Sequence, residues 1–558
     1  MTEPLVECVP NFSEGRNRAA IDRITSAIEA VDGVTLLDVD PGAATNRTVV
    51  TFVGPPDAVV EAAVAAGVTA ADVIDMGAHH GEHPRFGAMD VCPLVPVSGI
   101  TMEETMGLAR EVGSRLGDAG LTVFLYEKAA SAEHRRNLAD VRAGEYEGLE
   151  DKLRDRAWQP DFGPATFNPR SGATAVGARD FLIAYNVNLN TTSTRRANAV
   201  AFDVREKGRV ERDAAGGIVR DPAGEPVWIP GSLPSVKAIG WYIEEYGIAQ
   251  ISMNLTDISV TPIHAAFDEA AAMAAARGMR VTGSEIVGLI PLQAMLDAGR
   301  HYLRKQQRST GIADAELIKI AVRSMGLDEL GPFDPAQKII EYRLAPTDGA
   351  RLVDRTVRGF VEETASESVA PGGGSVAALA GALGAGLGTM VANLSAHKRG
   401  WDDRWEEFSD WAERGKGLHQ RLLALVDQDT DAFNGILAAH RLPAATPAEV
   451  AARMAAIEAA TRRAIEVPLA VMETAVASFE ILTAMAEQGM NSSVSDAGVG
   501  AIMARAAARG AALNVRVNAA GLDGADAYLE QASSLEIAAA GGEAAVMAIV
   551  GRRMAEAP

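Results

Sequence analysis

The pattern of apolar residues changes type once along this chain, near residue 351, and this change limits the possible folds more than any other feature. From Leu5 to about residue 330, short strand-like runs such as LVECVPNF and TVVTFVG alternate with amphipathic helical stretches. From Arg351 to the end, strand signals disappear and alanine-rich helical patterning takes over. The sequence therefore predicts a multidomain protein with an α+β part followed by an all-α part.

The α+β part divides again, because its rhythm of strands and helices restarts at FLIAYNVNL. We predict two α+β subdomains of ferredoxin-like type with mixed sheets, over residues 1–180 and 181–330. A linker over 331–350 leads to an all-helical domain over 351–558, and the length of 558 residues fits several folding units. A run rich in glycine, proline and charge over 205–237 predicts a long exposed hairpin.

Composition limits the partners and the compartment. Lysine and arginine total 52 against 74 acidic residues, and a net charge of -22 argues against a nucleic-acid partner. Cys8 and Cys92 are too few for a disulfide framework and fit a reducing compartment. The start MTEPLVECVPNFSEG has no signal-peptide pattern, so we expect a cytoplasmic protein. The uncharged stretch 376–394 consists mainly of alanine and glycine, which predicts a buried helix rather than a membrane span.

The segment 77–93, GAHHGEHPRFGAMDVCP, contains three of the nine histidines in one short connection. Imidazole is the side chain that, unperturbed, exchanges a proton near neutral pH. His83 is the best candidate, because Pro84 restricts its backbone to extended conformations while Gly81 and Gly87 permit turns on either side. A histidine held in a defined direction is suited to general acid-base catalysis.

Two other interpretations of this segment stay open at this stage. An isolated loop histidine is more often a hydrogen-bonded structural residue than a catalytic one. His79, His80 and His83 together could bind zinc, but neighbouring residues seldom converge on one ion without further ligands. We therefore predict no metal.

The helical part carries a second group of candidate residues, which begins with APGGGSVAALAG at 370–381. Three consecutive glycines precede a predicted helix, where exposed backbone N–H groups attract anions. The same glycines could equally form a tight turn that permits close helix packing. Gly372, Gly373, Gly374 and Ser375 are the candidates from this run.

A carboxylate in an apolar helical stripe is the more specific signal in this part. In LLALVDQDTDAF, helical spacing places Asp429 on the face of Leu422, Val426 and Phe433, whereas Asp427 and Asp431 point elsewhere and should be solvated. A buried Asp429 needs a raised pKa or a partner. It could serve catalysis or could brace a neighbouring helix.

Polar residues near the chain end add to this group. Asp496 in NSSVSDAGVG is a further candidate, although a helix-capping role is the stronger interpretation for it. Asn514 and Asn518, four residues apart, could present their amides on one helical face.

Long motifs in both parts resemble one known family, the bifunctional formiminotransferase-cyclodeaminases. LVECVPNFSEG, LLDVD, NRTVVTFVGPP, GEHPRFGAMDVCP, RAGEYEGL, DFGP, GATAVGARDFLIAYN, IGWYIEE and VGLIPLQAMLDA resemble the transferase half. APGGGSVAAL, LVDQDTDAF, IEVPL and VSDAGV resemble the cyclodeaminase half, which is itself similar to the methenyltetrahydrofolate cyclohydrolases. The resemblance covers nearly the whole chain, more thinly in its second part.

The resemblance implies two consecutive reactions of histidine breakdown and one-carbon metabolism. A formimino group would pass from N-formimino-L-glutamate to N5 of tetrahydrofolate, and 5-formiminotetrahydrofolate would then cyclise to 5,10-methenyltetrahydrofolate with release of ammonia, a lyase step. The small-molecule co-substrate would be tetrahydrofolate, in polyglutamylated form, with no metal. The family also implies a cytoplasmic homo-oligomer without a membrane span.

The resemblance also assigns roles to residues. His83 matches the general acid-base residue of the transferase, and Asp429 matches the catalytic aspartate of the cyclodeaminase. The folate-binding segment corresponds to Gly163, Pro164, Ala165, Thr166, Phe167, Asn168, Pro169, Arg170, Ser171 and Gly172. In this segment, Arg170 could face the glutamate tail.

Physical reasoning adds a carboxylate partner for His83 and anchors for substrate carboxylates. Asp40, at the end of LLDVD, could orient the His83 ring. Arg47 and Arg85 could bind substrate carboxylates bidentately. The resemblance further implies that polyglutamylated folate can pass between the two sites, which would require basic groups such as Lys398 and Arg399 along the route. Lys398 and Asp496 complete the predicted cyclodeaminase pocket.

Three alternatives compete with the bifunctional interpretation. The chain could be a transferase only, with a helical domain that serves dimerisation. It could be a non-catalytic folate-binding or scaffolding protein. It could also use a formyl donor instead of a formimino donor, since the sequence does not separate the two.

Overall fold

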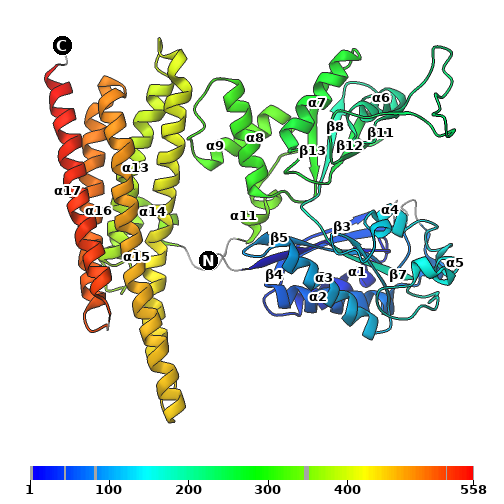
Figure 1. Cartoon of the computed structure of the whole chain (residues 1–558), viewed down its shortest axis with the longest axis horizontal. Coiled ribbons are helices and arrows are strands. Elements are labelled where there is room, and N and C mark those ends of the chain that lie inside the picture. The colour runs from blue at the N-terminus through cyan, green and yellow to red at the C-terminus, as the bar shows by residue number, and fades with distance from the viewer. Residues whose placement is uncertain (1–3, 43–45, 81–84, 345–350, 523, 557–558) are drawn as a thin grey trace. The chain divides into compact units, whose positions relative to one another are not determined.

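The computed structural model describes residues 4–42, 46–80, 85–344, 351–522 and 524–556. The chain divides into two compact units. An α/β unit comprises Met1–Met295 and Met325–Ala345, and a helical unit comprises Leu296–Ser324 and Pro346–Pro558. The predicted order of an α/β part followed by a helical part is confirmed (Figure 1).

The first subdomain of the α/β unit is a seven-stranded mixed sheet whose main helices cover one face. Strands β5–β7 and β6–β7 pair in parallel, whereas the other pairs are antiparallel. Its strands are β1 (Leu5–Cys8), β2 (Asn11–Phe12), β3 (Thr35–Gly42), β4 (Arg47–Gly54), β5 (Met89–Ser98), β6 (Thr122–Glu127) and β7 (Ala173–Ala178). Its main helices are α1 (Arg18–Glu29), α2 (Pro56–Val73) and α3 (Met102–Asp118).

Shorter helical elements complete this subdomain: η1 (Met76–Ala78), η2 (Glu133–Arg135), α4 (Leu138–Val141), α5 (Leu149–Arg154) and η3 (Arg156–Trp158).

Strand alternation and helix capping explain the arrangement of this subdomain. Val6 and Cys8 on β1 are fully buried in the core that α1, α2 and α3 cover (Figure 1), so the residue between them faces the opposite side. A capping box of Thr101 and Glu104 begins α3.

The second subdomain is a four-stranded sheet in the order β11-β12-β8-β13, antiparallel throughout. Its elements follow one another as β8 (Ile183–Leu189), α6 (Thr194–Val204), β9 (Arg209–Val210), β10 (Trp228–Ile229), β11 (Val236–Ile243), β12 (Ile248–Leu255), α7 (Ile263–Ala276) and β13 (Val281–Val287). Strands β9 and β10 pair as an antiparallel hairpin, which confirms the hairpin predicted over 205–237. Two short helices, α10 (Pro335–Lys338) and α11 (Ile340–Leu344), return to the first sheet, where Ile340 packs on Leu37 and Val53.

The helical unit is a bundle of long helices that lie side by side (Figure 1). They are α13 (Gly373–Ala396), α14 (Trp405–His440), α15 (Pro447–Gln488), α16 (Val494–Ala519) and α17 (Asp526–Ala555), with α12 (Val357–Thr364), η4 (Leu352–Asp354), η5 (Asp402–Arg404) and η6 (Asn491–Ser493) between or before them. The capping box of Thr446 and Glu449 begins α15, with Pro447 at the first helical position. These long helices confirm the all-α prediction.

Helix α13 contacts α14, α15 and α16, and its small residues let these neighbours approach closely. A Cβ atom at Gly384 would lie 2.8 Å from the carbonyl oxygen of Gly500. Among the described residues, α13, α15 and α17 are long and apolar enough to cross a membrane, and 61%, 67% and 22% of their most apolar windows are buried within the protein. Thus α13, predicted as a buried helix over 376–394, finds its apolar partners inside the bundle.

Helices α8 (Leu292–Lys305) and α9 (Asp314–Met325) connect the two units in sequence, and the segment 296–324 packs within the helical unit. Thr310 contacts Ser409 on α14, and Lys416, 4% exposed, forms an ion pair with Asp314 at 2.5 Å. This segment precedes the predicted linker over 331–350. Within that range, 345–350 lie outside the described residues, and the remainder carries α10 and α11.

Candidate functional site

A cleft of about 390 Å³ opens in the α/β unit between the uncovered face of the first sheet and the second sheet. Its polar lining is Glu7, Asn11, Asp38, Asp40, Arg47, Thr51, Tyr126, Arg142, Arg179 and Asn254. Its apolar lining is Val9, Val49, Val91, Pro93, Leu138, Phe181, Leu182, Ala184, Val287, Leu289, Pro291 and Ile340. A wider cavity of about 840 Å³ adjoins it, because Tyr126, Leu138, Arg142, Arg179, Leu182 and Asn254 line both.

Strand alternation aims these side chains into the cleft. On β4, Val50 and Phe52 are fully buried in the helix-covered core, whereas Arg47, Val49 and Thr51 line the cleft. The same alternation places Glu7, Asp38 and Asp40 on the cleft side of β1 and β3. The cleft is therefore lined by both acidic side chains and arginines, an arrangement that suits a zwitterionic or anionic ligand.

Arg47 is a plausible anchor for an anionic group. Its Nη2 donates a hydrogen bond to Oδ1 of Asn11, which is 6% exposed. Burial lowers the pKa of Arg47 to about 10, so the guanidinium remains charged at neutral pH. Arg142, also in the cleft, forms an ion pair with the buried Asp90. The structure thus places the predicted Arg47 in the cleft, together with a second arginine that the sequence did not indicate.

Asp40 lies in the same cleft and is exposed to it. Its neighbour Asp38 is half-buried, and burial, together with the charge of Asp40, raises the pKa of Asp38. The predicted partner of Asp40, His83, lies outside the described residues. The pairing of Asp40 with His83 therefore stays a prediction.

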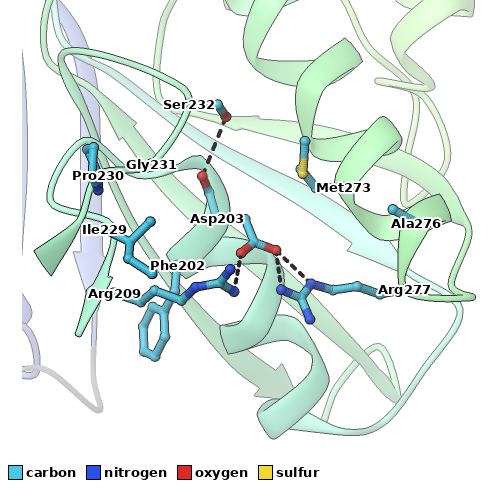
Figure 2. A pocket seen from close by; sticks show the side chains of 10 residues that line it. All are labelled: Phe202, Asp203, Arg209, Ile229, Pro230, Gly231, Ser232, Met273, Ala276 and Arg277. Atoms are coloured by element: carbon cyan, nitrogen blue, oxygen red, sulfur yellow. Dashed lines mark hydrogen bonds and ion pairs between the residues drawn. The ribbon is translucent and has the colours of Figure 1, made fainter. Parts of the chain in front are cut away.

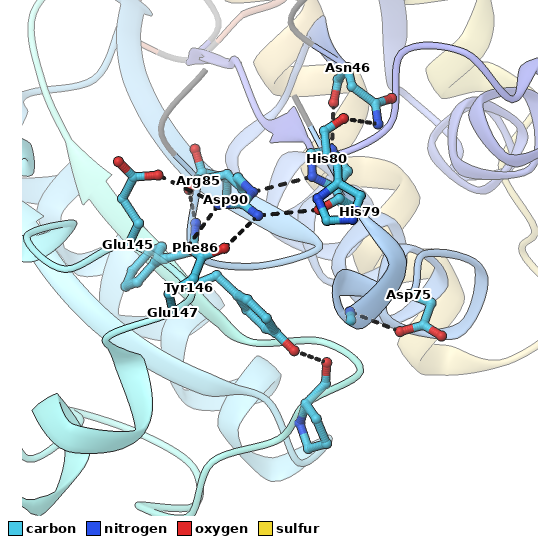
Figure 3. A network of polar contacts seen from close by, with 12 residues as sticks. Asn46, Asp75, His79, His80, Arg85, Phe86, Asp90, Glu145, Tyr146 and Glu147 are labelled. Atoms are coloured by element: carbon cyan, nitrogen blue, oxygen red, sulfur yellow. Dashed lines mark hydrogen bonds and ion pairs between the residues drawn. The ribbon is translucent and has the colours of Figure 1, made fainter. Parts of the chain in front are cut away.

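The flanks of the histidine segment are tied to the wall of the cleft (Figure 3). The side-chain amide of Asn46, the residue before Arg47, donates to the carbonyl oxygen of His80 at 3.0 Å. His79 is 7% exposed, and its Nε2 lies 2.8 Å from the carbonyl oxygen of Asn46 while its Nδ1 accepts from Nε of Arg85 at 3.3 Å. His79 is thus a hydrogen-bonded structural histidine that fixes the start of the segment.

Arg85 is held by acidic partners rather than by the cleft. Its guanidinium donates to both carboxylate oxygens of Glu147, at 2.9 and 3.0 Å, and lies 3.5 Å from Glu145 (Figure 3). This contact lowers the pKa of Glu147. Arg85 lines neither cavity of the site. Arg47 lines the cleft and Arg85 does not, so the structure favours Arg47 as the anchor of a substrate carboxylate.

The segment 163–172 lies beside the same histidine flank, outside the lining of both cavities. The N–H of Met76 donates to the carbonyl oxygen of Arg170 at 2.9 Å, and the hydroxyl of Tyr146 donates to the carbonyl of Pro169 at 2.6 Å. The guanidinium of Arg170, expected to face a glutamate tail, instead donates to the carbonyls of Ala71 and Asp72 at the end of α2. The negative end of that helix accounts for this position.

In the helical unit, the structure brings Asp429 and the glycine run together. Oδ2 of Asp429 accepts from the N–H of Ser375 at 2.8 Å and from its hydroxyl at 3.1 Å. A Cβ atom at Gly374 would lie 2.1 Å from Oδ1 of Asp429, so the contact requires glycine. Burial raises the pKa of Asp429, and the bonds from Ser375 oppose that shift. The anion at this helix N-terminus is the chain's own carboxylate.

Two details of this helix differ from the expectation. Asp427 is not simply solvated, because its carboxylate accepts from the N–H of Leu352 at 2.7 Å and so caps η4. Phe433 is 39% exposed, whereas Leu422 and Val426 are fully buried, because Phe433 lies off the buried face of the helix, which continues through Ala432 and Ala439. Asn514 lies close to this site, because a Cβ atom at Gly373 would be 3.7 Å from its amide nitrogen.

Lys398 and Asp496 lie away from Asp429. Lys398 follows the C-terminus of α13, about 36 Å of helix from Gly373, and its ammonium lies 3.8 Å from the ring centroid of Trp401. Asp496 is in the first turn of α16, some 18 residues before Asn514, which is roughly 27 Å of helix. Neither residue shares a site with Ser375, because each lies near the opposite end of a long helix from the end that carries the Asp429 site.

No other described group extends the site. Among the described residues, there is no cluster of three or more histidine, cysteine, aspartate or glutamate side chains that could hold a metal ion. A further cavity of about 500 Å³ lies beside the hairpin, where Asp203 pairs with Arg209 at 2.7 Å and with Arg277 at 2.5 Å (Figure 2). Asp203 is thus shared by two arginines, and none of the candidate site residues predicted from the sequence lines this cavity.

The cleft contains residues that the sequence did not indicate, chiefly Glu7, Asn11, Arg142 and Arg179. Glu7 had a readable signal, because an acid between the apolar Val6 and Cys8 of a strand must face away from their core. Arg142 and Arg179 lie at the ends of short elements, where no periodicity indicates a direction.

Comparison with known proteins agrees with this geometry in both units. The family profile described as "Formiminotransferase domain, N-terminal subdomain" matches residues 5–179, "Formiminotransferase domain" matches 184–345, and "Formiminotransferase-cyclodeaminase" matches 356–536. The Formimidoyltransferase-cyclodeaminase of Mus musculus is 44% identical over 517 residues, which cover 92% of each chain.

Relatives named for a single activity match part of this chain. The Glutamate formimidoyltransferase of Thermoplasma acidophilum is 43% identical over 303 residues, or 54% of this chain and 92% of its own. The Methenyltetrahydrofolate cyclohydrolase of Methylorubrum extorquens is 38% identical over 170 residues, or 30% of this chain and 82% of its own. Because the Mus musculus relative matches over 92% of each chain and the family profiles match both units, this chain belongs to the formiminotransferase-cyclodeaminase family.

Proposed function

We propose that the protein is both a glutamate formimidoyltransferase and a formimidoyltetrahydrofolate cyclodeaminase. The first activity transfers the formimino group of N-formimino-L-glutamate to N5 of tetrahydrofolate. The second cyclises 5-formiminotetrahydrofolate to 5,10-methenyltetrahydrofolate and releases ammonia. The observation that carries the proposal is the presence of one charged site in each unit, the cleft around Arg47 and the Asp429–Ser375 contact. The first lies within residues that match the formiminotransferase profiles, and the second within residues that match the formiminotransferase-cyclodeaminase profile.

The transferase reaction fits the cleft of the α/β unit. N5 attacks the amidine-like carbon, and the leaving amino group of glutamate must gain a proton while N5 loses one. We assign the proton transfer to His83. On the N-terminal side of this residue, Asn46 bonds the carbonyl of His80 and Arg85 bonds the ring of His79, and Asn46 directly precedes Arg47 of the cleft. Arg47, charged and within the cleft, binds a carboxylate of formiminoglutamate.

The cyclodeaminase reaction fits Asp429. Closing N10 onto the formimino carbon requires a proton to leave N10 and another to reach the departing nitrogen. The pKa of Asp429 is raised by burial, which makes the group a better base than an exposed aspartate and allows it to return the proton as an acid. Ser375 holds one carboxylate oxygen, so Oδ1 remains to exchange protons.

We further propose that the protein acts in histidine degradation in the cytoplasm, on polyglutamylated tetrahydrofolate, as a homo-oligomer. The two cysteines are free and buried, which suits a reducing compartment. Oligomerisation is supported by an apolar face on the neighbouring helices α13 and α16. Its exposed side chains are Val376, Leu383, Met390, Leu394, Val499, Ile502, Leu513 and Val517.

One assay tests both activities. The purified chain is given formiminoglutamate and tetrahydrofolate, and released glutamate, released ammonia and methenyltetrahydrofolate absorbance are followed separately. Equal release of glutamate and ammonia supports the bifunctional proposal. Glutamate without ammonia would instead indicate a transferase with a structural helical domain, and no product from formiminoglutamate but turnover of formylglutamate would indicate the formyl donor.

A further inference from the structure

Glu7 is a buried carboxyl group without a partner in the cleft. It is 5% exposed, and no hydrogen bond or ion pair from a described residue ends on its side chain. The neighbouring Val6 and Cys8 are buried in the opposite core, so the strand directs Glu7 into the cleft. Enclosing a carboxylate without donors is costly. A ligand that supplies two N–H donors would remove this cost.

The lining near Glu7 suits a flat heterocycle. Val9 follows Glu7 just beyond the end of β1, and Pro93 lies on the neighbouring β5. Phe181 and Ile340 come from the segments that carry Arg179 and Glu341, the two charged groups whose fields act on Glu7. The walls beside Glu7 are therefore largely apolar, although Asp38 and Tyr126 also line this end of the cleft. A planar ring with adjacent N–H groups on one edge can stack on such walls and meet both carboxylate oxygens.

Both substrates of the proposed transferase offer a pair of N–H donors. The distance of Glu7 from the reacting end of the cleft decides which of the two substrates it binds. Glu7 precedes Asn11 by four residues, and Asn11 bonds Arg47 at the end of the cleft where Asn46 holds His80. At a strand rise of about 3.3 Å per residue, Glu7 lies up to about 13 Å from that end. The formimino group must react at the His80 end, so it does not reach Glu7. The pyrimidine edge of the pterin can reach Glu7, because it lies on the far side of the ring system from the reacting N5.

Resting on the transferase function proposed above, we infer that Glu7 recognises the pterin of tetrahydrofolate, with its carboxylate accepting hydrogen bonds from N3–H and the 2-amino group. Glu7 is then a specificity residue for the folate substrate and not a proton carrier. The orientation places the amide edge of the pterin at Glu7 and N5 toward Arg47.

A pH dependence of binding follows. Burial raises the pKa of Glu7 to about 7, although Arg179 opposes the shift and Glu341 adds to it. Two N–H donors require the ionised form, so folate affinity falls as the pH drops below 7. Asp38 on β3 and Tyr126 on β6 are the other titratable groups that line this end of the cleft, and burial raises the pKa of each.

The test measures the dissociation constants of the full chain for tetrahydrofolate and for its 2-desamino-2-methyl analogue, without formiminoglutamate. The variants are Glu7→Gln and, as a matched control, Glu61→Gln, whose exposed carboxylate on α2 pairs with Arg115 outside the cleft. We expect Glu7→Gln to weaken tetrahydrofolate binding about 10- to 100-fold, the range for a charge-assisted pair. Wild type should prefer tetrahydrofolate to the analogue about 10-fold or more, and Glu7→Gln should lose this preference and the pH dependence.

Unchanged dissociation constants in Glu7→Gln, with a lower kcat for glutamate release, would overturn the inference and make Glu7 a proton carrier. A higher KM for formiminoglutamate alone would also overturn it and place the formimino group at Glu7. Failure of the proposed function looks different, because wild type would then release no glutamate while still binding tetrahydrofolate. Glu7→Asp, which keeps the charge but shortens the reach, serves as a second variant if Glu7→Gln does not fold.

Discussion

Two carboxyl groups, the buried Glu7 in the α/β unit and the half-buried Asp429 in the helical unit, are held in opposite ways. Asp429 is bonded by the backbone and hydroxyl of Ser375 at the start of α13. No described residue bonds Glu7, which lines an apolar stretch of its cleft. A carboxylate fixed by its own protein is preorganised for chemistry, whereas one left without donors is suited to bind a ligand.

His83→Ala should have the largest effect on the activities of the two units. Removing the proposed acid-base group should lower glutamate release by about 10²- to 10⁴-fold. Ammonia release should fall equally, because the second site receives no substrate. Supplying 5-formiminotetrahydrofolate directly should restore ammonia release to the wild-type rate. If ammonia release stays low with this substrate, the two sites are not independent.

Gly374→Ala should damage the helical site alone. The new Cβ would lie 2.1 Å from Oδ1 of Asp429, so the carboxylate must move. We expect ammonia release to fall about 100-fold, as for an ångström-scale misplacement of a catalytic group, with glutamate release unchanged. Gly386→Ala on the same helix is the control, because nothing lies within 4 Å of its new Cβ. Equal loss in both variants would point to a general effect on α13.

Arg47→Ala tests the charge balance of the cleft. Losing the proposed carboxylate anchor should raise the KM for formiminoglutamate about 10- to 100-fold. Steady-state kinetics with each substrate varied in turn measure this effect, and the KM for tetrahydrofolate should change much less. An effect confined to tetrahydrofolate would assign Arg47 to the other substrate.

Glu7→Gln should stabilise the protein at alkaline pH. The folded-state pKa of Glu7 is about 7, above the ordinary 4.5, so from pH 4.5 to 7 the unfolded chain releases a proton that the folded chain retains. The free energy of unfolding of the wild type therefore falls between pH 4.5 and 7, and above pH 7 it stays lower by on the order of 3 kcal/mol. Thermal unfolding of the variant should therefore occur about 5 °C higher at pH 8 and at the wild-type temperature at pH 4. Equal shifts at both pH values would contradict the assignment.

Much of the fold could be predicted because its signals are local. Helical periodicity placed Asp429 beside Leu422 and Val426, and a capping box located the start of α15 at Thr446. The glycine run at 372–374 and Asp429 were both chosen from the sequence, and the structure brings them into contact. These features depend on spacing within one element.

The remaining site features depend on contacts between distant segments. Arg85 is neutralised by Glu147, 62 residues away, so an arginine that looked available for a substrate is not. Lys398 and Asp496 were grouped with Ser375 by chemistry, but the length of the helices separates them. Arg142 enters the cleft through its ion pair with Asp90 on another element. Residue type alone does not reveal such pairings.

The central claim, one reaction in each unit, is tested most directly by Asp429→Asn in the assay that follows both products. Asp427→Asn is the matched control, since Asp427 caps η4 two residues away on the same helix. The account predicts that Asp429→Asn releases glutamate at the wild-type rate, accumulates 5-formiminotetrahydrofolate and loses ammonia release by about 100-fold or more, while Asp427→Asn retains both products. Wild-type ammonia release from Asp429→Asn, or loss of glutamate release with it, would contradict the account.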